Sequence, residues 1–167
     1  MFDIETTSLK PYEGVVTLIG MKRRGNITIW KLWEFNNEAK MIDEVLGEIS
    51  EIFETIVGYN NLKFDVPFML ERIRLLGQWE DYYYQIYNKK WFDLYQYLGN
   101  DYRSLASWLD RAQIKREHPE LSGRNMPRYY EEGQYEKIVQ HNVDDLNTSE
   151  SLFYFLKKRN PEILPSE

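Results

Sequence analysis

The chain has 167 residues, of which 43% are hydrophobic and 16% are aromatic, so we expect one folded domain over residues 1–167 rather than a disordered chain. It contains no cysteine, which excludes disulfides and thiolate metal sites; a metal would need oxygen ligands or one of the two histidines, which favours Mg²⁺ or Mn²⁺ over zinc. The net charge of −6 argues against a protein that holds nucleic acid by bulk positive charge alone.

The opening residues alternate between apolar and acidic side chains. Phe2 and Ile4 alternate with Asp3 and Glu5, and this period of two predicts a half-buried strand with both acids on the same face. Two carboxylates side by side on a core strand repel each other and lose hydration, and a divalent cation between them would reverse the sign of that energy. The alternative is a frayed, solvated N-terminus whose acids have no function.

The next residues predict a β-hairpin. Residues 15–22 are rich in β-branched side chains, residues 23–26 form a tight turn and residues 27–33 return as a second strand. The longest apolar run, 15–21, is far too short to span a bilayer, and no signal-peptide pattern precedes it. We therefore expect no membrane contact and a cytoplasmic location.

Helical patterns dominate the rest of the chain. The expected elements are, in order, a helix over roughly 38–53, a strand at 55–59, and helices at 66–76, 105–112 and 135–158, with a charged loop at 113–128 and residues 78–100 unassigned. A hairpin followed by a helical crossover predicts an α/β fold, with a mixed β-sheet of about five strands, a parallel pairing to the first strand and flanking helices.

Two later segments carry further candidate site residues. Asp65 follows a predicted strand just ahead of a helix, where its carboxylate can hold a ligand or act as an ordinary N-cap. His141 and Asp145 are four residues apart in the last helix and share a mostly apolar face, which favours a buried His–Asp pair. The alternative for His141 is a core histidine bonded to its neighbour. Asp144 falls on another face, where we expect it to be solvated.

In this order, these acids resemble the motifs of one enzyme family. Phe2-Asp3-Ile4-Glu5-Thr6-Thr7, Gly58-Tyr59-Asn60 with Phe64-Asp65, and His141-Asn142-x-x-Asp145 are similar to the motifs of DEDD (DnaQ-like, proofreading-type) 3′–5′ exonucleases of the RNase H-like superfamily. The third motif is similar to that of a branch of predicted stand-alone exonucleases. The link between motifs in that branch is also similar to Trp91-Phe92-Asp93-Leu94 with Ser104-Leu105. The resemblance covers nearly the whole chain and implies an RNase H-like fold.

The chain departs from the family pattern at two places. Family members place either Tyr four residues or His five residues before the last Asp, whereas His141 stands at the Tyr spacing from Asp145. The family also has several apolar residues ahead of its first Asp, whereas the sequence begins just before Phe2. We therefore expect a short first strand, and residues ahead of Met1 in the natural protein.

The resemblance implies a reaction that uses two divalent ions, Mg²⁺ or Mn²⁺. By position, Asp3 would bridge both ions, Glu5 and Asp145 would hold the ion that activates water, and Asp65 would help to place the second ion. His141 would orient or deprotonate the attacking water, because its pKa is ordinarily near neutral.

The implied substrate is single-stranded DNA or RNA. Thr6 and Asn60 could contact the terminal nucleotide, although turn or cap chemistry explains them equally well. Arg23 and Arg24 on the hairpin tip could contact phosphates. Other candidates for phosphate contact or base stacking, any of which could equally be solvated or core residues, are Lys89, Lys90, Lys115, Arg116, Arg124, Arg128, Tyr82, Tyr83, Tyr84, Trp91 and Tyr95.

Three functions remain open at this point. The leading hypothesis is a metal-dependent 3′–5′ exonuclease that releases nucleoside 5′-monophosphates from single-stranded ends. The second is an endonuclease of the same fold. The third is a non-catalytic nucleic-acid-binding module that retains the acids as structural caps. The sequence does not identify protein partners.

Overall fold

The computed structural model describes residues 1–99 and 103–163, without the side chains of 79–82. Strands β1 (Phe2–Thr6), β2 (Val16–Arg23) and β3 (Asn26–Lys31) form an antiparallel sheet in the order β1-β2-β3. Strands β4 (Ile56–Gly58) and β5 (Trp91–Asp93) form a separate parallel pair. The α/β architecture with flanking helices is therefore confirmed.

The predicted parallel pairing to the first strand is wrong in its partner. In the described residues the parallel ladder joins β4 to β5, although β4 lies next to β1. The amide of Ile4, which faces this neighbour, donates to Asp65 Oδ1 at 3.0 Å. A side chain therefore takes a backbone donor of β1 that a strand ladder would otherwise use on that side.

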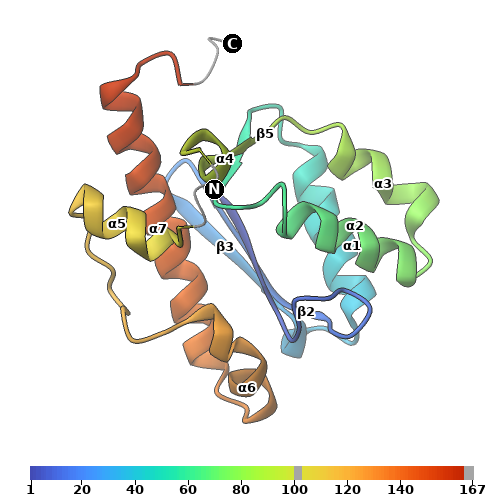
Figure 1. Ribbon diagram of the computed structural model, residues 1–167. Coiled ribbons are helices and arrows are strands. Elements are labelled where there is room, and N and C mark those ends of the chain that lie inside the picture. The colour runs from blue at the N-terminus through green and yellow to red at the C-terminus, as the bar shows by residue number, and fades with distance from the viewer. Residues whose placement is uncertain (100–102, 164–167) are drawn as a thin grey trace.

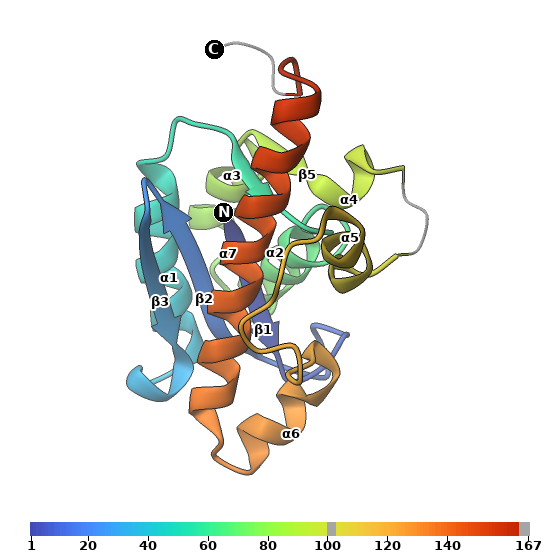
Figure 2. The same cartoon turned by 90° about the vertical axis from the view of Figure 1, so that its left-hand side faces the viewer.

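Helices lie on both faces of the three-stranded sheet (Figures 1 and 2). The long helix α7 runs across one face, and α1 lies on the other. The helices of the described residues are α1 (Glu38–Ser50), α2 (Asp65–Leu75), α3 (Trp79–Tyr87), α4 (Leu94–Tyr97), α5 (Leu105–Ala112), α6 (Met126–Glu131) and α7 (Tyr135–Arg159), with 3₁₀ turns at η1 (Leu32–Glu34) and η2 (Gly123–Asn125). None of these helices, in the part of the chain described, is long and apolar enough to cross a membrane.

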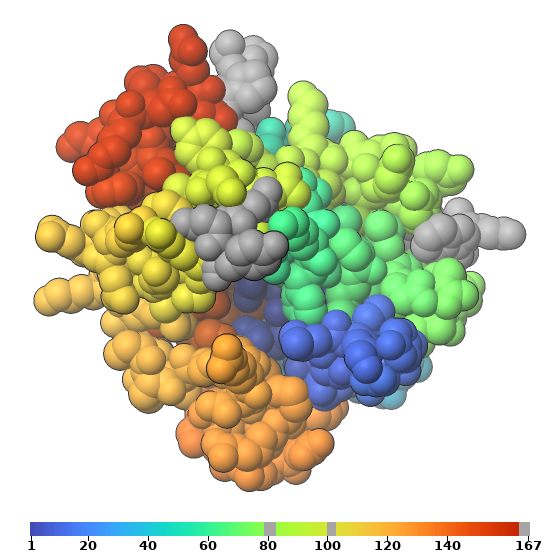
Figure 3. All heavy atoms as spheres, in the orientation of Figure 1, coloured from blue at the N-terminus to red at the C-terminus, as the bar shows by residue number. Residues whose placement is uncertain are grey.

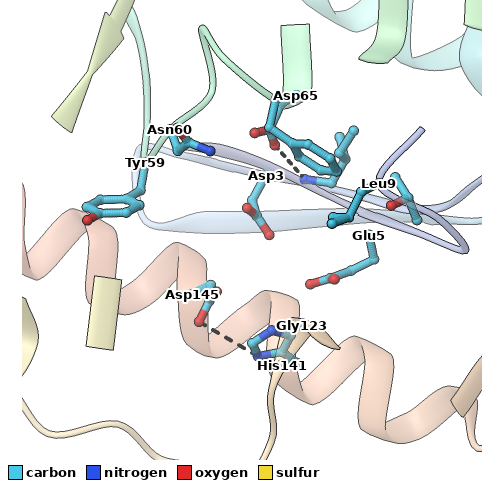
Figure 4. A pocket seen from close by; sticks show the side chains of 12 residues that line it. Asp3, Glu5, Leu9, Tyr59, Asn60, Asp65, Gly123, His141 and Asp145 are labelled. Carbon is cyan, nitrogen blue, oxygen red and sulfur yellow. Dashed lines mark hydrogen bonds and ion pairs between the residues drawn. The ribbon is translucent and has the colours of Figure 1, made fainter. Parts of the chain in front are cut away.

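The two faces of β1 have opposite characters, as its alternating sequence predicts. Phe2 and Ile4 are buried in the main core with side chains of α1 and α2. Asp3 and Glu5 face α7 instead (Figure 4). Across the ladder they pair with Gly20 and Leu18 of β2. The core thus fixes the orientation of β1, and thereby directs both acids to the α7 side of the sheet.

Local sequence signals explain most element boundaries. The hairpin tip has left-handed backbone at Arg24 and Gly25, with φ of 51° and 82°, as a two-residue turn requires. The side chain of Asn37 accepts the amide of Lys40 and starts α1, and Ser104 accepts the amide of Ser107 in α5.

Two segments differ from the sequence reading. The stretch 113–128, expected to be a loop, contains η2 and the start of α6, because Pro127 sits in the first turn of that helix. The unassigned stretch 78–100 forms α3, β5 and α4, although Asn100 and the side chain of Tyr82 lie outside the described residues.

Asp93 connects β5 to the loop that follows β4. Its buried carboxylate accepts the amide of Asn60 at 2.8 Å, that of Leu62 at 3.2 Å and that of Tyr95 at 2.9 Å. Asn60 has a φ of 62°, a left-handed conformation that asparagine tolerates better than most residues. One carboxylate therefore caps α4 and holds the 60–62 turn in place.

We expect Asp93→Ala to lower the free energy of unfolding by about 2–3 kcal/mol, or the Tm by about 5–10 °C, because three backbone donors lose their acceptor. Thermal unfolding followed by circular dichroism measures this loss. Asp93→Asn keeps an oxygen acceptor and should lose less, and Glu48→Gln at an exposed position of α1 should leave the Tm within about 1 °C. An Asp93→Ala protein as stable as wild type would contradict this assignment.

Candidate active site

A cavity of about 200 Å³ opens between β1, the start of α2 and α7. In the space-filling view, the residues of β1 lie recessed in a hollow between the loop after β1 and the α6 region (Figure 3). Its lining residues are Asp3, Ile4, Glu5, Thr6, Leu9, Tyr59, Asn60, Phe64, Asp65, Gly123, His141 and Asp145. The four acids and the histidine singled out in the sequence thus border one cavity, although they come from three distant segments.

Asp3 is held in the cavity by an amide from α7. The fully buried Asn142 donates from Nδ2 to Asp3 Oδ2 at 2.7 Å. This close approach requires a glycine at position 20, because a Cβ there would lie 1.8 Å from Asn142 Oδ1. The sequence reading included Asn142 in a motif without giving it a function, and it did not connect Gly20 with the site.

Asp65 is the first residue of α2 but does not cap that helix. Its Oδ1 accepts the amide of Ile4 in β1, and Phe64 occupies the N-cap position. The bond joins the second acidic segment to the first, so that Asp65 lies on the same side of the cavity as Asp3 and Glu5, opposite Asp145 and His141 of α7 (Figure 4). The ordinary N-cap alternative therefore does not describe its contacts.

His141 and Asp145 lie on one face of α7, as their spacing predicts. His141 Nδ1 is 3.8 Å from Asp145 Oδ1. Burial lowers the pKa of His141 to about 4, and the positive charge of Arg116 acts in the same direction. The imidazole is therefore neutral near pH 7.

Asp144 is not solvated, contrary to the sequence reading. It is 3% exposed, and its carboxylate accepts the backbone amides of Glu117 and His118, each at 3.1 Å, as well as Arg116 Nε at 3.1 Å. The prediction was wrong because the segment 113–118 folds back over this face of α7, a long-range contact that helical periodicity cannot reveal.

Arg116 extends from this segment into the site. Its Nη2 donates to Asp145 Oδ1 at 2.6 Å and contacts His141 Nδ1 at 3.1 Å. In the sequence Arg116 was only one of several loop cations that could contact phosphate, and no local signal distinguished it.

The cavity acids share a strong tendency to stay protonated. Burial raises the pKa of Asp3 and that of Glu5 well above their usual values, and repulsion between neighbouring carboxylates adds to the effect. Burial also raises the pKa of Asp65 to about 7 and that of Asp145 to about 6, the latter despite the nearby Arg116. Ionisation of this cluster is therefore costly in the absence of an opposite charge, and a bound cation would favour the ionised carboxylates.

Comparison with known proteins identifies the family. A family model described as the RNase H superfamily matches residues 1–157. The chain belongs to the RNase H superfamily. A search among curated protein sequences gave no match.

Several solved structures are similar to this RNase H superfamily chain. The family B DNA polymerase of the hyperthermophilic archaeon Pyrobaculum calidifontis matches with a TM-score of 0.73 and 18% identity over 95% of this chain and 24% of the polymerase. Product-bound exonuclease I matches with a TM-score of 0.66 and 12% identity over 97% of this chain and 43% of that one. The zinc-bound E. coli exonuclease I complex with single-stranded DNA gives the same score and identity, over 97% and 40%. The chain spans less than half of each protein, and at these low identities the TM-scores show a shared fold alone.

The donor set of the RNase H superfamily site suits a hard divalent cation. All four acids offer carboxylate oxygens, and their raised pKa values reflect burial and repulsion that a cation would relieve. Among the described residues, no three acidic or imidazole groups are already arranged to hold an ion. At Asp145, one carboxylate oxygen, Oδ1, accepts a hydrogen bond from Arg116.

The other sequence-predicted contacts divide into two groups. Thr6 and Asn60 line the cavity. Arg23 and Arg24 do not; both guanidinium groups pair with Glu54, at 2.9 and 3.0 Å. Lys89 donates to the carbonyl oxygens of Ser50, the last residue of α1, and Ile52, so these bonds give this lysine a structural role.

We expect Asp65→Asn to stabilise the metal-free protein increasingly as the pH rises from about 5 to about 8. The pKa of Asp65 is raised from 3.8 to about 7, so the stability associated with its protonated form is present at low pH and lost as the pH rises through 7. Asparagine keeps an oxygen for the Ile4 amide but carries no charge. The expected gain near pH 8 is about 2 kcal/mol, measured by urea denaturation.

The lowered pKa of His141 makes the free energy of unfolding rise with pH, the opposite of the effect of Asp65. This effect is confined to the range between about pH 4 and pH 6.5, the ordinary pKa of histidine. The window above pH 6.5 therefore isolates the acids. Glu48→Gln is the matched control and should show no pH-dependent gain, and saturating Mg²⁺ should reduce the advantage of Asp65→Asn. An advantage that shrinks between pH 6.5 and 8 without metal would refute the assignment.

Proposed function

We propose that residues 1–167 act as one metal-dependent 3′–5′ exonuclease domain that hydrolyses single-stranded DNA or RNA ends to nucleoside 5′-monophosphates. The observation that carries the proposal is the single cavity bordered by Asp3, Glu5, Asp65, Asp145 and His141. Isolated acids at helix and strand ends have ordinary structural explanations, but four buried or half-buried carboxylates with raised pKa values around one opening do not stabilise a fold.

Each acid has a proposed place in the reaction. Asp3 would contact both ions, Glu5 and Asp145 would hold the ion near the attacking water, and Asp65 would serve the second ion. When bound, two Mg²⁺ or Mn²⁺ ions supply positive charge that stabilises the attacking and leaving oxygens of an in-line phosphoryl displacement. Neutral His141 borders the same cavity and would orient the attacking water or accept its proton.

The relatives support the same chemistry. Two of the similar structures are of exonuclease I, one with bound product and one with single-stranded DNA, and the third is a family B polymerase. The sequence motifs resemble the DEDD, DnaQ-like branch of 3′–5′ exonucleases, and the carboxylates of all three motifs line the cavity.

The substrate end would enter beside β1. Thr6 and Asn60 offer hydrogen-bonding groups there, and Leu9, which is 83% exposed at the rim, offers an apolar surface to a base. Arg23 and Arg24 would contact phosphates only at a distance from this opening, and only by leaving Glu54.

The test is digestion of 5′-labelled single-stranded DNA and RNA, each with a free or blocked 3′ end, in Mg²⁺ or Mn²⁺. We expect a ladder that shortens from the free 3′ end. Asp3→Asn should lower the rate by at least about two orders of magnitude, because one ligand contributes several kcal/mol of transition-state stabilisation. Glu48→Gln should digest like wild type.

Other outcomes point to the other two functions. Cleavage of a covalently closed single-stranded circle would indicate an endonuclease, since a circle has no end. Normal binding of the oligonucleotides without metal uptake, measured by calorimetry with Mn²⁺, would indicate a non-catalytic binding module. A ladder that persists unchanged in Asp3→Asn would refute the proposed site.

A further inference from the structure

Arg116 is the one cation among the described residues that pairs with a cavity acid. Its side chain is 14% exposed and binds Asp144 through Nε, and Asp145 Oδ1 and His141 Nδ1 through Nη2. A guanidinium has no acceptor, so Arg116 must donate to His141. Nδ1 therefore accepts this bond with its lone pair, and the proton of the neutral ring is on Nε2. The guanidinium of Arg116 thus binds an oxygen of Asp145, a proposed metal ligand, and a nitrogen of His141, the proposed base.

The anchor of Arg116 lies outside the cavity. Asp144 is buried and bonded to two backbone amides of the 113–118 segment, so its position does not depend on the guanidinium alone. If Arg116 leaves Asp145, it keeps its bond to Asp144 and remains a paired ion. When Arg116 releases Asp145, the guanidinium is therefore not left as a buried, unpaired charge, which would cost several kcal/mol.

We propose that Arg116, held by Asp144, is a positioning residue that competes with the divalent cation for Asp145. It neutralises Asp145 while the site is metal-free, and cation binding requires its withdrawal from Oδ1. Because the same Nη2 contacts His141, withdrawal also frees Nδ1, which links occupation of the metal site to the availability of the imidazole. The inference rests on the proposed function for the identity of the ligand.

The competition can be measured without substrate, by calorimetric titration of the full chain with Mn²⁺ near pH 7.5. Arg116→Met should bind Mn²⁺ about tenfold more tightly than wild type. Lys115→Met removes the same charge from the adjacent residue, whose side chain is exposed and does not line the cavity, and this variant should bind Mn²⁺ with wild-type affinity. Thermal unfolding with and without Mn²⁺ gives an independent readout, with a larger metal-induced rise in Tm for Arg116→Met.

Unchanged or weaker Mn²⁺ binding by Arg116→Met would overturn the proposal, as would equal tightening by Lys115→Met. If Arg116→Met does not fold, Arg116→Gln replaces it, because its amide can still donate to Asp144. Loss of the proposed exonuclease function is a separate result. Tighter Mn²⁺ binding by the variant supports competition even if no oligonucleotide is cut, and an active enzyme with unchanged binding overturns the competition alone.

Discussion

Repulsion among carboxylates inside one partly buried cavity is the constraint around which this structure is built. Asp3 is bonded to the Asn142 amide, Asp65 to the backbone of Ile4 and Asp145 to the guanidinium of Arg116. Each donor comes from a different segment, so the site acids also join distant parts of the chain. These bonds lower the cost of burial without removing it, because the pKa values of the acids remain raised.

Contacts of the site acids also shape the surroundings of β1. Asp65 takes the edge amide of Ile4, on the side of β1 where no strand ladder is present in the described residues. On the opposite side of β1, Gly20 leaves room for Asn142 against the sheet. The site therefore determines local features of the fold, and the fold is not merely a support to which acids were added.

Local periodicity was sufficient to predict the elements that carry the site. Alternation placed Asp3 and Glu5 on one face of a strand, and helical spacing placed His141 beside Asp145, because both patterns reflect which side of an element is buried. The same reasoning failed for Asp144, whose burial is caused by the distant 113–118 segment. It also could not single out Asp93 or Arg116. Partners of each residue lie far away in the chain, and a single sequence does not show which distant residues are in contact.

The compensation of charge in the cavity is asymmetric. On the β1 and α2 side, the donors to Asp3 and Asp65 are a neutral amide and a backbone N–H. On the α7 side, Asp145 is bonded to a full positive charge. Among the described residues, Asp3, Glu5 and Asp65 therefore have no paired cationic side chain, and an incoming cation would favour their ionised form most directly. A cation bound at that side would in turn repel the guanidinium, so that release of Asp145 becomes easier once the cavity has begun to fill.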